Sequence, residues 1–434
     1  MMNSSKTYYV SSIHGRDDYD GLTEHTPFRS LHQINRLSLN PGDQVLIECN
    51  SIFENEYLHL TSQGTSEAPI VITSYGEGLM PAIHTNGNGL WYQDYGNALD
   101  SSTHIRTGYV SSAILLYDAQ YIEISKLEVT NSSTYLLQEE YSAPHKMDRS
   151  GVAVVAQNHG TLHHIHIKNL CIHDVHGNVY NKHMNNGGIY ATVLKPLNEE
   201  LTGIPRFNDF LVEDCYLHKV SRWGIAIGYT YLHDKFRESE LADELFLQYG
   251  HENIHIRNNY VKAAGGDGIT PMYALRPIVE HNVADGVACE MNDAIYQFPE
   301  NRMGKVAAGI WPWKCKDALF RYNEVVDTRL NQDGMAYDAD SGDGTIYEYN
   351  YSRLNEGGCV MFCLEQSIHN QFCHNISYDD LGGTISPAQN PDAYLAHNHF
   401  FIRKGVPFIR KHMDGGNFIE ENNQLITIEK NKRK

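Results

Sequence analysis

The stretch Gly309-Ile310-Trp311-Pro312-Trp313 is followed by Asp333-Gly334-Met335-Ala336-Tyr337-Asp338-Ala339-Asp340 and then by Asn355-Glu356-Gly357-Gly358. Gly309, Gly334 and Gly358 are 25 and 24 residues apart, and each of them opens a short apolar run. A repeat of this length is typical of one coil of a parallel β-solenoid. Three consecutive coils would therefore carry two tryptophans and a cluster of carboxylates.

The same repeat extends through most of the chain. Earlier glycine-led runs begin at Gly151, Gly188, Gly224 and Gly268. A second apolar strand in each repeat ends in an asparagine, and these residues are Asn169, Asn259, Asn282, Asn323, Asn350, Asn375, Asn398 and Asn423. Asparagine tolerates the left-handed backbone of a sharp corner, and stacked amides can hydrogen-bond along the solenoid axis. We interpret these asparagines as structural.

The organisation favours one elongated domain over residues 1–434, because no linker rich in Pro, Gly or Ser interrupts the repeats. We expect a cap and first coils in 1–85, a loop insertion around Trp91 in 86–109, repeat coils in 110–425 and a basic tail in 426–434. A second insertion, from Phe236 to Tyr249, has the pattern of a short amphipathic helix.

The amino-terminal part resembles a known superfamily. The residues that carry the resemblance are Tyr8 to Ser12, Asp20-Gly21-Leu22, Thr26 to Leu31, Pro41 to Ile47 and Ala68 to Gly76. They look like the entry to right-handed parallel β-helix enzymes of the pectin-lyase-like superfamily. The resemblance implies an all-β, single-stranded right-handed parallel β-helix, whose open end is covered by a short α-helix so that strand edges are not exposed.

The second half resembles β-helix glycoside hydrolases. The motifs Gly-Ile-Trp-Pro-Trp at 309–313, Asp-Gly-x-x-x-Asp-x-Asp at 333–340 and Asn-Glu-Gly-Gly at 355–358 are similar to those of family 141 and, more loosely, of β-helix lacto-N-biosidases. The resemblance implies hydrolysis of a glycosidic bond by Asp or Glu, without naming the sugar.

Charge restricts the partners. The formal net charge is −19, so binding to nucleic acid is disfavoured; the cluster Lys430 to Lys434 is expected to be a frayed basic end. Ten acidic and five basic residues lie between Ala307 and Gln366. Such a site would repel polyuronates, so a neutral oligosaccharide or polysaccharide is the expected substrate. Nothing in the sequence decides the oligomeric state.

The cysteines and the apolar patterning bear on the compartment. The eight cysteines, Cys49, Cys171, Cys215, Cys289, Cys315, Cys359, Cys363 and Cys373, have no metal-like spacing and are expected to be buried free thiols. Met1 to Lys6 contain no apolar leader, and no run approaches the length of a membrane span. We expect a cytoplasmic protein that does not contact membranes.

The expected chemistry lies on the strand from Met335 to Asp340. Because side chains alternate between the two faces of a strand, Asp338 and Asp340 should point away from the core and lie beside Trp311 and Trp313 of the previous coil. Glycoside hydrolysis requires one protonated and one ionised carboxyl group. We predict Asp338 or Asp340 as nucleophile or base and Asp333 or Glu356 as acid, and Asp before Gly is also an ordinary turn residue.

Further residues are expected to line the sugar site. Asp267 should add a carboxylate to the patch, and the remaining predicted substrate-binding residues are Trp311, Trp313, Arg222, Trp223, Tyr273 and Lys314. For Arg222, Trp223 and Tyr273, packing in the core or at the rim is an equally good interpretation.

No metal or cofactor is predicted. His163, His164 and His166 invite a metal site, but strand alternation should separate them and no carboxylate recurs at ligand spacing. The main alternative function is a polysaccharide lyase or uronate epimerase that uses Lys314, Lys316 or Tyr337, often with calcium. A noncatalytic carbohydrate-binding β-helix is a third interpretation.

Overall fold

The structure is a computed structural model and describes residues 5–102, 104–132, 147–291, 306–410 and 415–429. Residue contacts divide the chain into two compact units: unit 1 holds Met1–Ser221 and Tyr229–Tyr231, and unit 2 holds Arg222–Gly228 and Leu232–Lys434. Whether the two form a single domain stays a prediction. The predicted basic tail lies largely outside the described residues.

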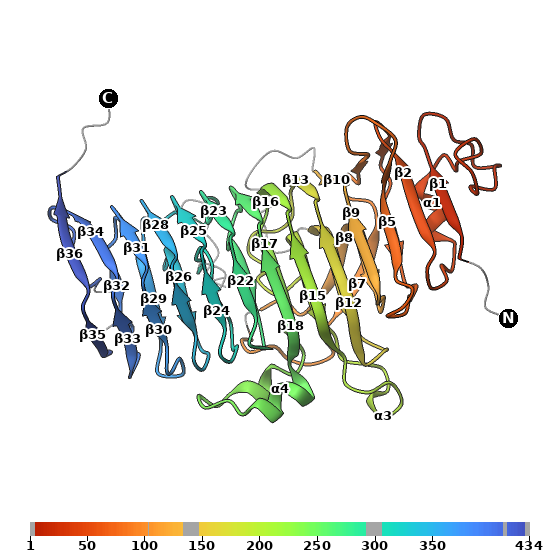
Figure 1. The fold of residues 1–434 in the computed structure, drawn as a ribbon. Coiled ribbons are helices and arrows are strands. Elements are labelled where there is room, and N and C mark those ends of the chain that lie inside the picture. The colour runs from red at the N-terminus through yellow and green to blue at the C-terminus, as the bar shows by residue number, and fades with distance from the viewer. Residues whose placement is uncertain (1–4, 103, 133–146, 292–305, 411–414, 430–434) are drawn as a thin grey trace. The chain divides into compact units, whose positions relative to one another are not determined.

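Unit 1 contains three parallel sheets, which we call the first, second and third sheets (Figure 1). The first sheet runs in the order β1 (Thr7–Val10), β2 (Gln44–Glu48), β5 (Ile70–Tyr75), β9 (Ile122–Ser125), β12 (Thr161–Lys168) and β15 (Arg206–Glu213). The second runs β3 (Ile52–Glu54), β6 (Ala82–His84), β10 (Glu128–Asn131), β13 (Cys171–Val175) and β16 (Tyr216–Val220). The third runs β4 (Leu58–Leu60), β8 (Thr107–Tyr117), β11 (Asp148–Ala156) and β14 (Gly187–Val193).

Two short helices and one antiparallel strand complete unit 1. The helices are α1 (Leu31–Asn35) and α3 (Glu199–Thr202). α1 buries Leu31 and Ile34, which confirms the short amino-terminal helix. The region 86–109 was expected to be a loop, but it contains β7 (Leu90–Asp94), which pairs antiparallel with β8. Trp91 is buried there, and its indole N–H is satisfied by donating to Ser112 Oγ at 2.8 Å.

Unit 2 repeats the three-sheet arrangement. Its first sheet runs β18 (His251–Arg257), β22 (Ile278–Glu280), β24 (Leu319–Arg321), β27 (Ile346–Glu348), β30 (Gln371–Cys373), β33 (Ala393–Ala396) and β35 (Phe418–Glu421), with β21 (Ala274–Leu275) beside β18. Its second runs β19 (Tyr260–Lys262), β23 (Val283–Asp285), β25 (Glu324–Val326), β28 (Tyr351–Arg353), β31 (Ile376–Tyr378), β34 (His399–Arg403) and β36 (Gln424–Ile428). The third-sheet strands are β17 (Trp223–Thr230) with β20 (Ile269–Pro271), and β26 (Met335–Asp340) with β29 (Gly358–Cys363) and β32 (Ile385–Ser386).

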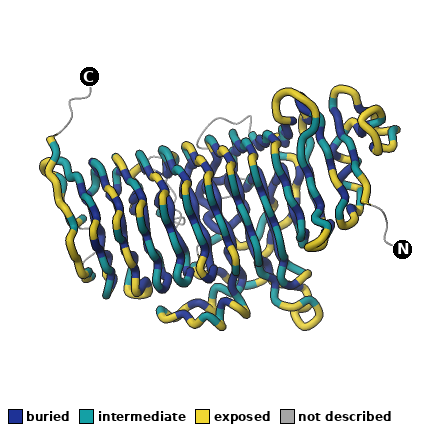
Figure 2. Tube along the Cα trace, in the orientation of Figure 1, coloured by how far each residue is buried: buried dark blue, intermediate teal, exposed yellow. Residues whose placement is uncertain are grey.

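In unit 2 the chain therefore supplies one strand to the first sheet and one to the second in turn, with the third-sheet strands falling between them in most coils, as in a right-handed parallel β-helix. In the first sheet Leu319 pairs with Ile346, Ile346 with Gln371 and Gln371 with Tyr394, which are steps of 27, 25 and 23 residues. Buried and partly exposed residues alternate along these strands, as Figure 2 shows. The predicted all-β parallel β-helix is confirmed.

The glycine repeat has a steric cause. A Cβ on Gly268 would lie 2.3 Å from the carbonyl oxygen of Gly309, and one on Gly309 would lie 2.4 Å from that of Ala336. Both distances are far too short for any side chain, so the coils approach closely here. The partner of Gly309 is thus Ala336 and not Gly334, two residues earlier. The glycine spacing of 25 residues therefore gave the approximate coil length, and the step from Gly309 to the residue opposite it is 27 residues.

The asparagine repeat forms a ladder along unit 2. Each amide Nδ2 donates to Oδ1 of the next asparagine at 2.9 to 3.2 Å through Asn259, Asn282, Asn323, Asn350, Asn375, Asn398 and Asn423. The structural interpretation is confirmed for these seven asparagines, whereas Asn169 lies outside the ladder, exposed and with a left-handed φ of 52°. The left-handed residue at each corner is the one before the ladder asparagine, for example Tyr349 with φ 56° before Asn350.

The insertion between β17 and β18 docks on the coils of unit 2. The expected amphipathic helix is shorter than 236–249, because a 3-10 turn, η1 (His233–Phe236), precedes α4 (Asp243–Tyr249). Asp243 binds Arg276 at 2.6 Å and Lys316 at 3.2 Å. The insertion is thereby fixed next to the coil that carries Trp313.

Within the described residues, no helix is sufficiently long and apolar to cross a membrane. Five of the eight free cysteines are buried, Cys171 and Cys373 are partly buried, and Cys289 is exposed. The expectation of buried thiols is therefore wrong for Cys289.

Candidate active site

The tryptophan segment and β26 lie side by side in unit 2, as predicted. Ile310 bridges to Tyr337 and Trp313 bridges to Asp340, which places Trp311 opposite Asp338. Tyr337 is fully buried, and its hydroxyl donates to the carbonyl of Tyr351 at 2.8 Å. Because neighbouring side chains on a strand alternate, Asp338 and Asp340 lie on the face of β26 opposite to the core.

The next coil, β29, places Met361 opposite Asp338 and Cys363 opposite Asp340. Single ligand atoms of Asp338, Asp340 and Cys363 all lie within 4.8 Å of one another. Two carboxylates this close disfavour simultaneous ionisation, and one of them is thus predisposed to hold a proton. This is the condition that acid–base chemistry needs. The same three groups could also bind a metal ion.

The two carboxylates differ in exposure. Asp338 is 4% exposed, whereas Asp340 is half-buried and accepts a hydrogen bond from Ser341 Oγ at 2.6 Å. Asp340 is therefore the more accessible of the two to a substrate.

Lys314 adds a cation beside Asp340. It is 8% exposed, and its ammonium donates to Gln366 Oε1 at 3.3 Å. Burial lowers the pKa of Lys314, and the negative charges of Asp340 and Glu238 oppose this effect. A positive charge at this place favours the ionised form of Asp340.

The two tryptophans have different environments. Their rings are stacked with centroids 5.8 Å apart, but Trp311 is only 3% exposed while Trp313 is half-buried. A sugar ring requires an accessible aromatic face. Trp313 is consequently the candidate platform, and Trp311 supports it from behind.

Asp267 and Arg222 form a buried ion pair. Arg222 Nη2 lies 2.9 Å from Asp267 Oδ2, and neither side chain is exposed. Asp267 Oδ1 also accepts from the Trp311 indole at 2.9 Å. Trp223, fully buried, stacks on Trp311 at 6.3 Å. The prediction that Asp267 belongs to an exposed carboxylate patch is wrong, because its charge is neutralised by Arg222 and the pair fixes the indole.

Tyr273 is 1% exposed and packs against Phe236 at 5.1 Å. Of its two interpretations, the core position is the one observed.

Asp333 lies directly before β26 and is held by a residue far along the chain. Asp333 is 8% exposed, and Arg410 Nη1 donates to the carbonyl oxygens of Asp333 at 2.7 Å and Gly357 at 2.6 Å. Arg410 thereby ties the starts of β26 and β29 together. The sequence analysis did not find Arg410, because it lies 77 residues after Asp333 and outside the motifs.

The carboxylate of Glu356 already binds two other groups of the protein. Its carboxylate lies 3.1 Å from Arg329 Nη1 and accepts from the Leu330 amide at 2.7 Å, with a side chain 34% exposed. Both contacts occupy the carboxylate oxygens that an acid would have to present to the leaving group, so Glu356 is a poor candidate for the acid.

Two of the three histidines of β12 lie together, contrary to the expectation. His164 and His166 have ring centroids 3.8 Å apart, and both bind Asp209, at 2.8 and 3.0 Å. The cause is local: His164 has φ 51°, which breaks the alternation. Glu123 joins His164 and His166 to form a group that could hold a metal ion.

A parallel β-helix that carries paired carboxylates beside a half-buried tryptophan defines a class, the carbohydrate-active β-helix proteins. No protein-family model matches the chain. The crystal structure of the GH136 lacto-N-biosidase from Eubacterium ramulus is 61% identical, covers 98% of this chain and 68% of that chain, and superposes with a TM-score of 0.95. This chain belongs to the GH136 lacto-N-biosidase family.

A curated relative supports the same assignment. The lacto-N-biosidase of Bifidobacterium longum subsp. longum is 38% identical over 462 residues, which cover 97% of this chain. The chain spans 29% of the length of that relative.

Proposed function

We propose that this chain is a lacto-N-biosidase, a glycoside hydrolase that releases the disaccharide lacto-N-biose from oligosaccharides. The observation that carries the proposal is the likeness to the Eubacterium ramulus lacto-N-biosidase over 98% of this chain. The substrate agrees with the expectation of a neutral sugar, which was drawn from the surplus of acidic residues around β26.

The proposed reaction uses Asp340 and Asp333. Asp340 is half-buried beside the Lys314 cation, which suits an ionised nucleophile or base. Asp333 is the remaining candidate for the acid, because Glu356 is held by Arg329. Asp338, close to Asp340 but buried, would tune the charge of Asp340 rather than attack the sugar.

Trp313 would position the substrate. Its half-buried indole lies opposite Asp340 in the register, so a pyranose ring packed on the indole would have its glycosidic bond near that carboxylate. Lys314 adds a hydrogen-bond donor at the same place.

The test is product analysis. The protein is incubated with an oligosaccharide that ends in lacto-N-biose and, separately, with aryl glycosides of lacto-N-biose, galactose and N-acetylglucosamine. We expect release of intact lacto-N-biose and little cleavage of either monosaccharide glycoside. Release of single sugars only, or of unsaturated uronates from a polyuronate, would contradict the proposal, the latter in favour of the lyase alternative.

A further inference from the structure

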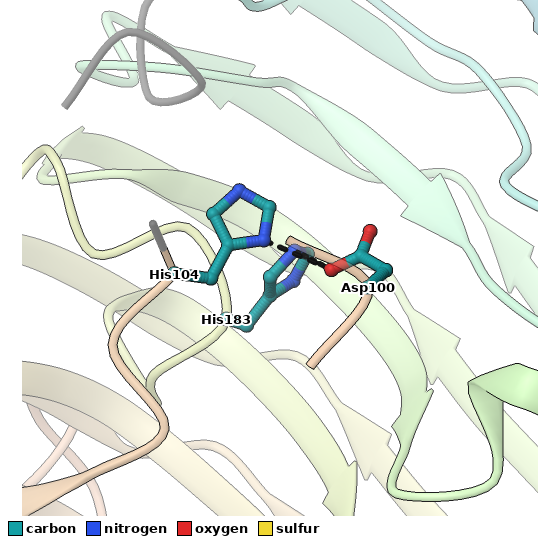
Figure 3. A group of neighbouring side chains, drawn as sticks. All are labelled: Asp100, His104 and His183. Carbon is teal, nitrogen blue, oxygen red and sulfur yellow. Dashed lines mark hydrogen bonds and ion pairs between the residues drawn. The ribbon is translucent and has the colours of Figure 1, made fainter. Parts of the chain in front are cut away.

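Asp100, His104 and His183 form a group in unit 1 that the proposed hydrolysis does not use (Figure 3). Asp100 and His104 lie in the segment between β7 and β8, and His183 lies between β13 and β14. In Figure 3 both imidazole rings lie next to the Asp100 carboxylate. Two segments about 80 residues apart therefore bring two imidazoles and one carboxylate to the same point.

The three donor atoms have the separations of metal ligands. Asp100 Oδ1 lies 2.9 Å from His104 Nδ1 and 3.6 Å from His183 Nε2. One ligand atom from each of the three residues lies within 4.8 Å of the other two. In a tetrahedral Zn²⁺ site, bonds of about 2.0 to 2.2 Å put neighbouring ligand atoms roughly 3.3 to 3.6 Å apart.

A simple hydrogen-bonded cluster accounts for part of this arrangement. The 2.9 Å contact is an ordinary hydrogen bond from His104 to the carboxylate. The 3.6 Å separation of His183 Nε2 from the same oxygen is too long for one, although it suits two ligands of one ion. Binding requires only that His104 move back by a few tenths of an ångström, roughly the difference from ideal tetrahedral spacing.

The two imidazoles are held in place by their surroundings. The His104 side chain is 4% exposed and that of His183 is 0% exposed. His183 stacks on Tyr229 with centroids 3.8 Å apart and meets the edge of His104 at 4.3 Å. The backbone carbonyl of His183 accepts from Tyr95 Oη at 2.6 Å. Such fixed, desolvated rings lose little entropy when they bind a cation.

The carboxylate has the outer contacts typical of a metal ligand. Tyr229 Oη donates to Asp100 Oδ1 at 2.9 Å, and the Ser101 amide donates to it at 3.0 Å. Such outer hydrogen bonds orient ligating carboxylates.

We propose that Asp100, His104 and His183 bind one divalent transition-metal ion of the Zn²⁺ type, with water in the remaining position. Imidazole and carboxylate ligands suit Zn²⁺ in preference to Ca²⁺ or Mg²⁺, which take oxygen ligands. The ion joins the segment between β7 and β8 to the segment that precedes β14 and so stabilises the contact between these two segments.

Metal content and binding test the proposal. Protein without an affinity tag is freed of metal with a chelator, dialysed, and titrated with Zn²⁺ by calorimetry and with Co²⁺ by visible absorption. We expect one equivalent of Zn²⁺, a Co²⁺ spectrum of a tetrahedral site with nitrogen and oxygen ligands, and a higher Tm with Zn²⁺ than without. Calcium should produce none of these changes.

The variants identify the site. His104→Ala should weaken Zn²⁺ binding at least about 100-fold, because loss of a direct ligand costs more than loss of an outer contact. His166→Ala tests the Glu123 group, and His14→Ala, a histidine paired with Glu48, is the matched control. Both should bind Zn²⁺ as the parent does. If the parent binds no Zn²⁺, or if His104→Ala retains full affinity while His166→Ala loses it, the proposal is overturned.

Discussion

Lys314 and Arg410 bring positive charge to two different carboxylates of the candidate active site. The Lys314 charge acts on Asp340, whereas the Arg410 charge acts on Asp333 and its side chain binds the Asp333 carbonyl. Lys314 is buried and Arg410 is partly buried, and burial lowers the pKa of each. These cations therefore influence which carboxylate holds the proton.

Replacing Arg410 tests that influence on Asp333. In Arg410→Gln the pKa of Asp333 should rise, because a nearby positive charge that favours ionisation is lost. An acid with a higher pKa stays protonated to a higher pH. The alkaline limb of the kcat/KM profile should hence move to higher pH.

Arg403→Gln is the matched control, because Arg403 pairs with Asp379 at 2.6 Å in another corner of unit 2. It should leave the profile unchanged. If the alkaline limb of the kcat/KM profile of Arg410→Gln stays at the parental pH, even with a lower maximum rate, the prediction is contradicted. Arg410 would then act only by holding the backbone.

At the scale of elements, the features that recur in every coil could be predicted from the sequence, whereas contacts that occur only once could not. Alternation and coil length sufficed to place Trp311 and Trp313 beside Asp338 and Asp340 on neighbouring coils, because both are properties of every parallel coil. The Arg222–Asp267 ion pair and the bond from the Arg410 side chain to the Asp333 carbonyl join residues from different coils, and no local pattern encodes them. At His164 the rule of alternation itself failed. One left-handed residue brings His164 and His166 to the same face of the strand, although alternation predicted that the histidines are separated.

The asparagine ladder makes a stability prediction. Asn350 is 2% exposed, accepts from the Asn323 amide and donates to the Phe320 carbonyl at 2.9 Å. In Asn350→Ala these buried groups lose their partners, at about 1 to 3 kcal/mol each. We expect the free energy of unfolding to fall by roughly 3 kcal/mol or more, measured by urea denaturation.

Asn417 is exposed, and within the described part of the chain only its backbone amide is bonded, to the Asn390 carbonyl, so Asn417→Ala serves as control. A loss below about 1 kcal/mol in Asn350→Ala would mean that the ladder sets register without adding stability.

His59 on β4 makes a pH prediction. Burial lowers the pKa of His59 to about 4, although its bond to the Ser112 carbonyl at 2.9 Å opposes this. The unfolded chain, with a pKa of about 6.5, binds the proton first. The neutral histidine is therefore fully compatible with folding above pH 6.5, and stability falls as the pH decreases from about 6.5 towards 4.

His59→Gln keeps a donor but cannot titrate. Between pH 6.5 and 4 its unfolding free energy should fall less than that of the parent, by up to about 3 kcal/mol at the acid end. Equal slopes for the two proteins across this range would contradict the burial of a neutral His59.

At the scale of the whole molecule, family membership and site geometry answer different questions. The likeness to the Eubacterium ramulus structure covers 98% of this chain and assigns the family, although no protein-family model matches it. The coils of unit 2 supply the carboxylates, the tryptophan and the cations within a few consecutive turns. The sequence motifs implied a glycoside hydrolase, and the structure reduces the candidate residues to a smaller set.

The central claim is that Asp340 and Asp333 perform the hydrolysis. Its most direct test is the kcat/KM of Asp340→Asn and Asp333→Asn for release of lacto-N-biose, beside Glu356→Gln, with folding checked by circular dichroism. We predict a loss of at least about 10²-fold in both Asn variants, because each loses a proton-transfer or nucleophilic role, and near-parental rates in Glu356→Gln. Folded Asp340→Asn and Asp333→Asn proteins with parental rates, or a Glu356→Gln protein without activity, would contradict the assignment.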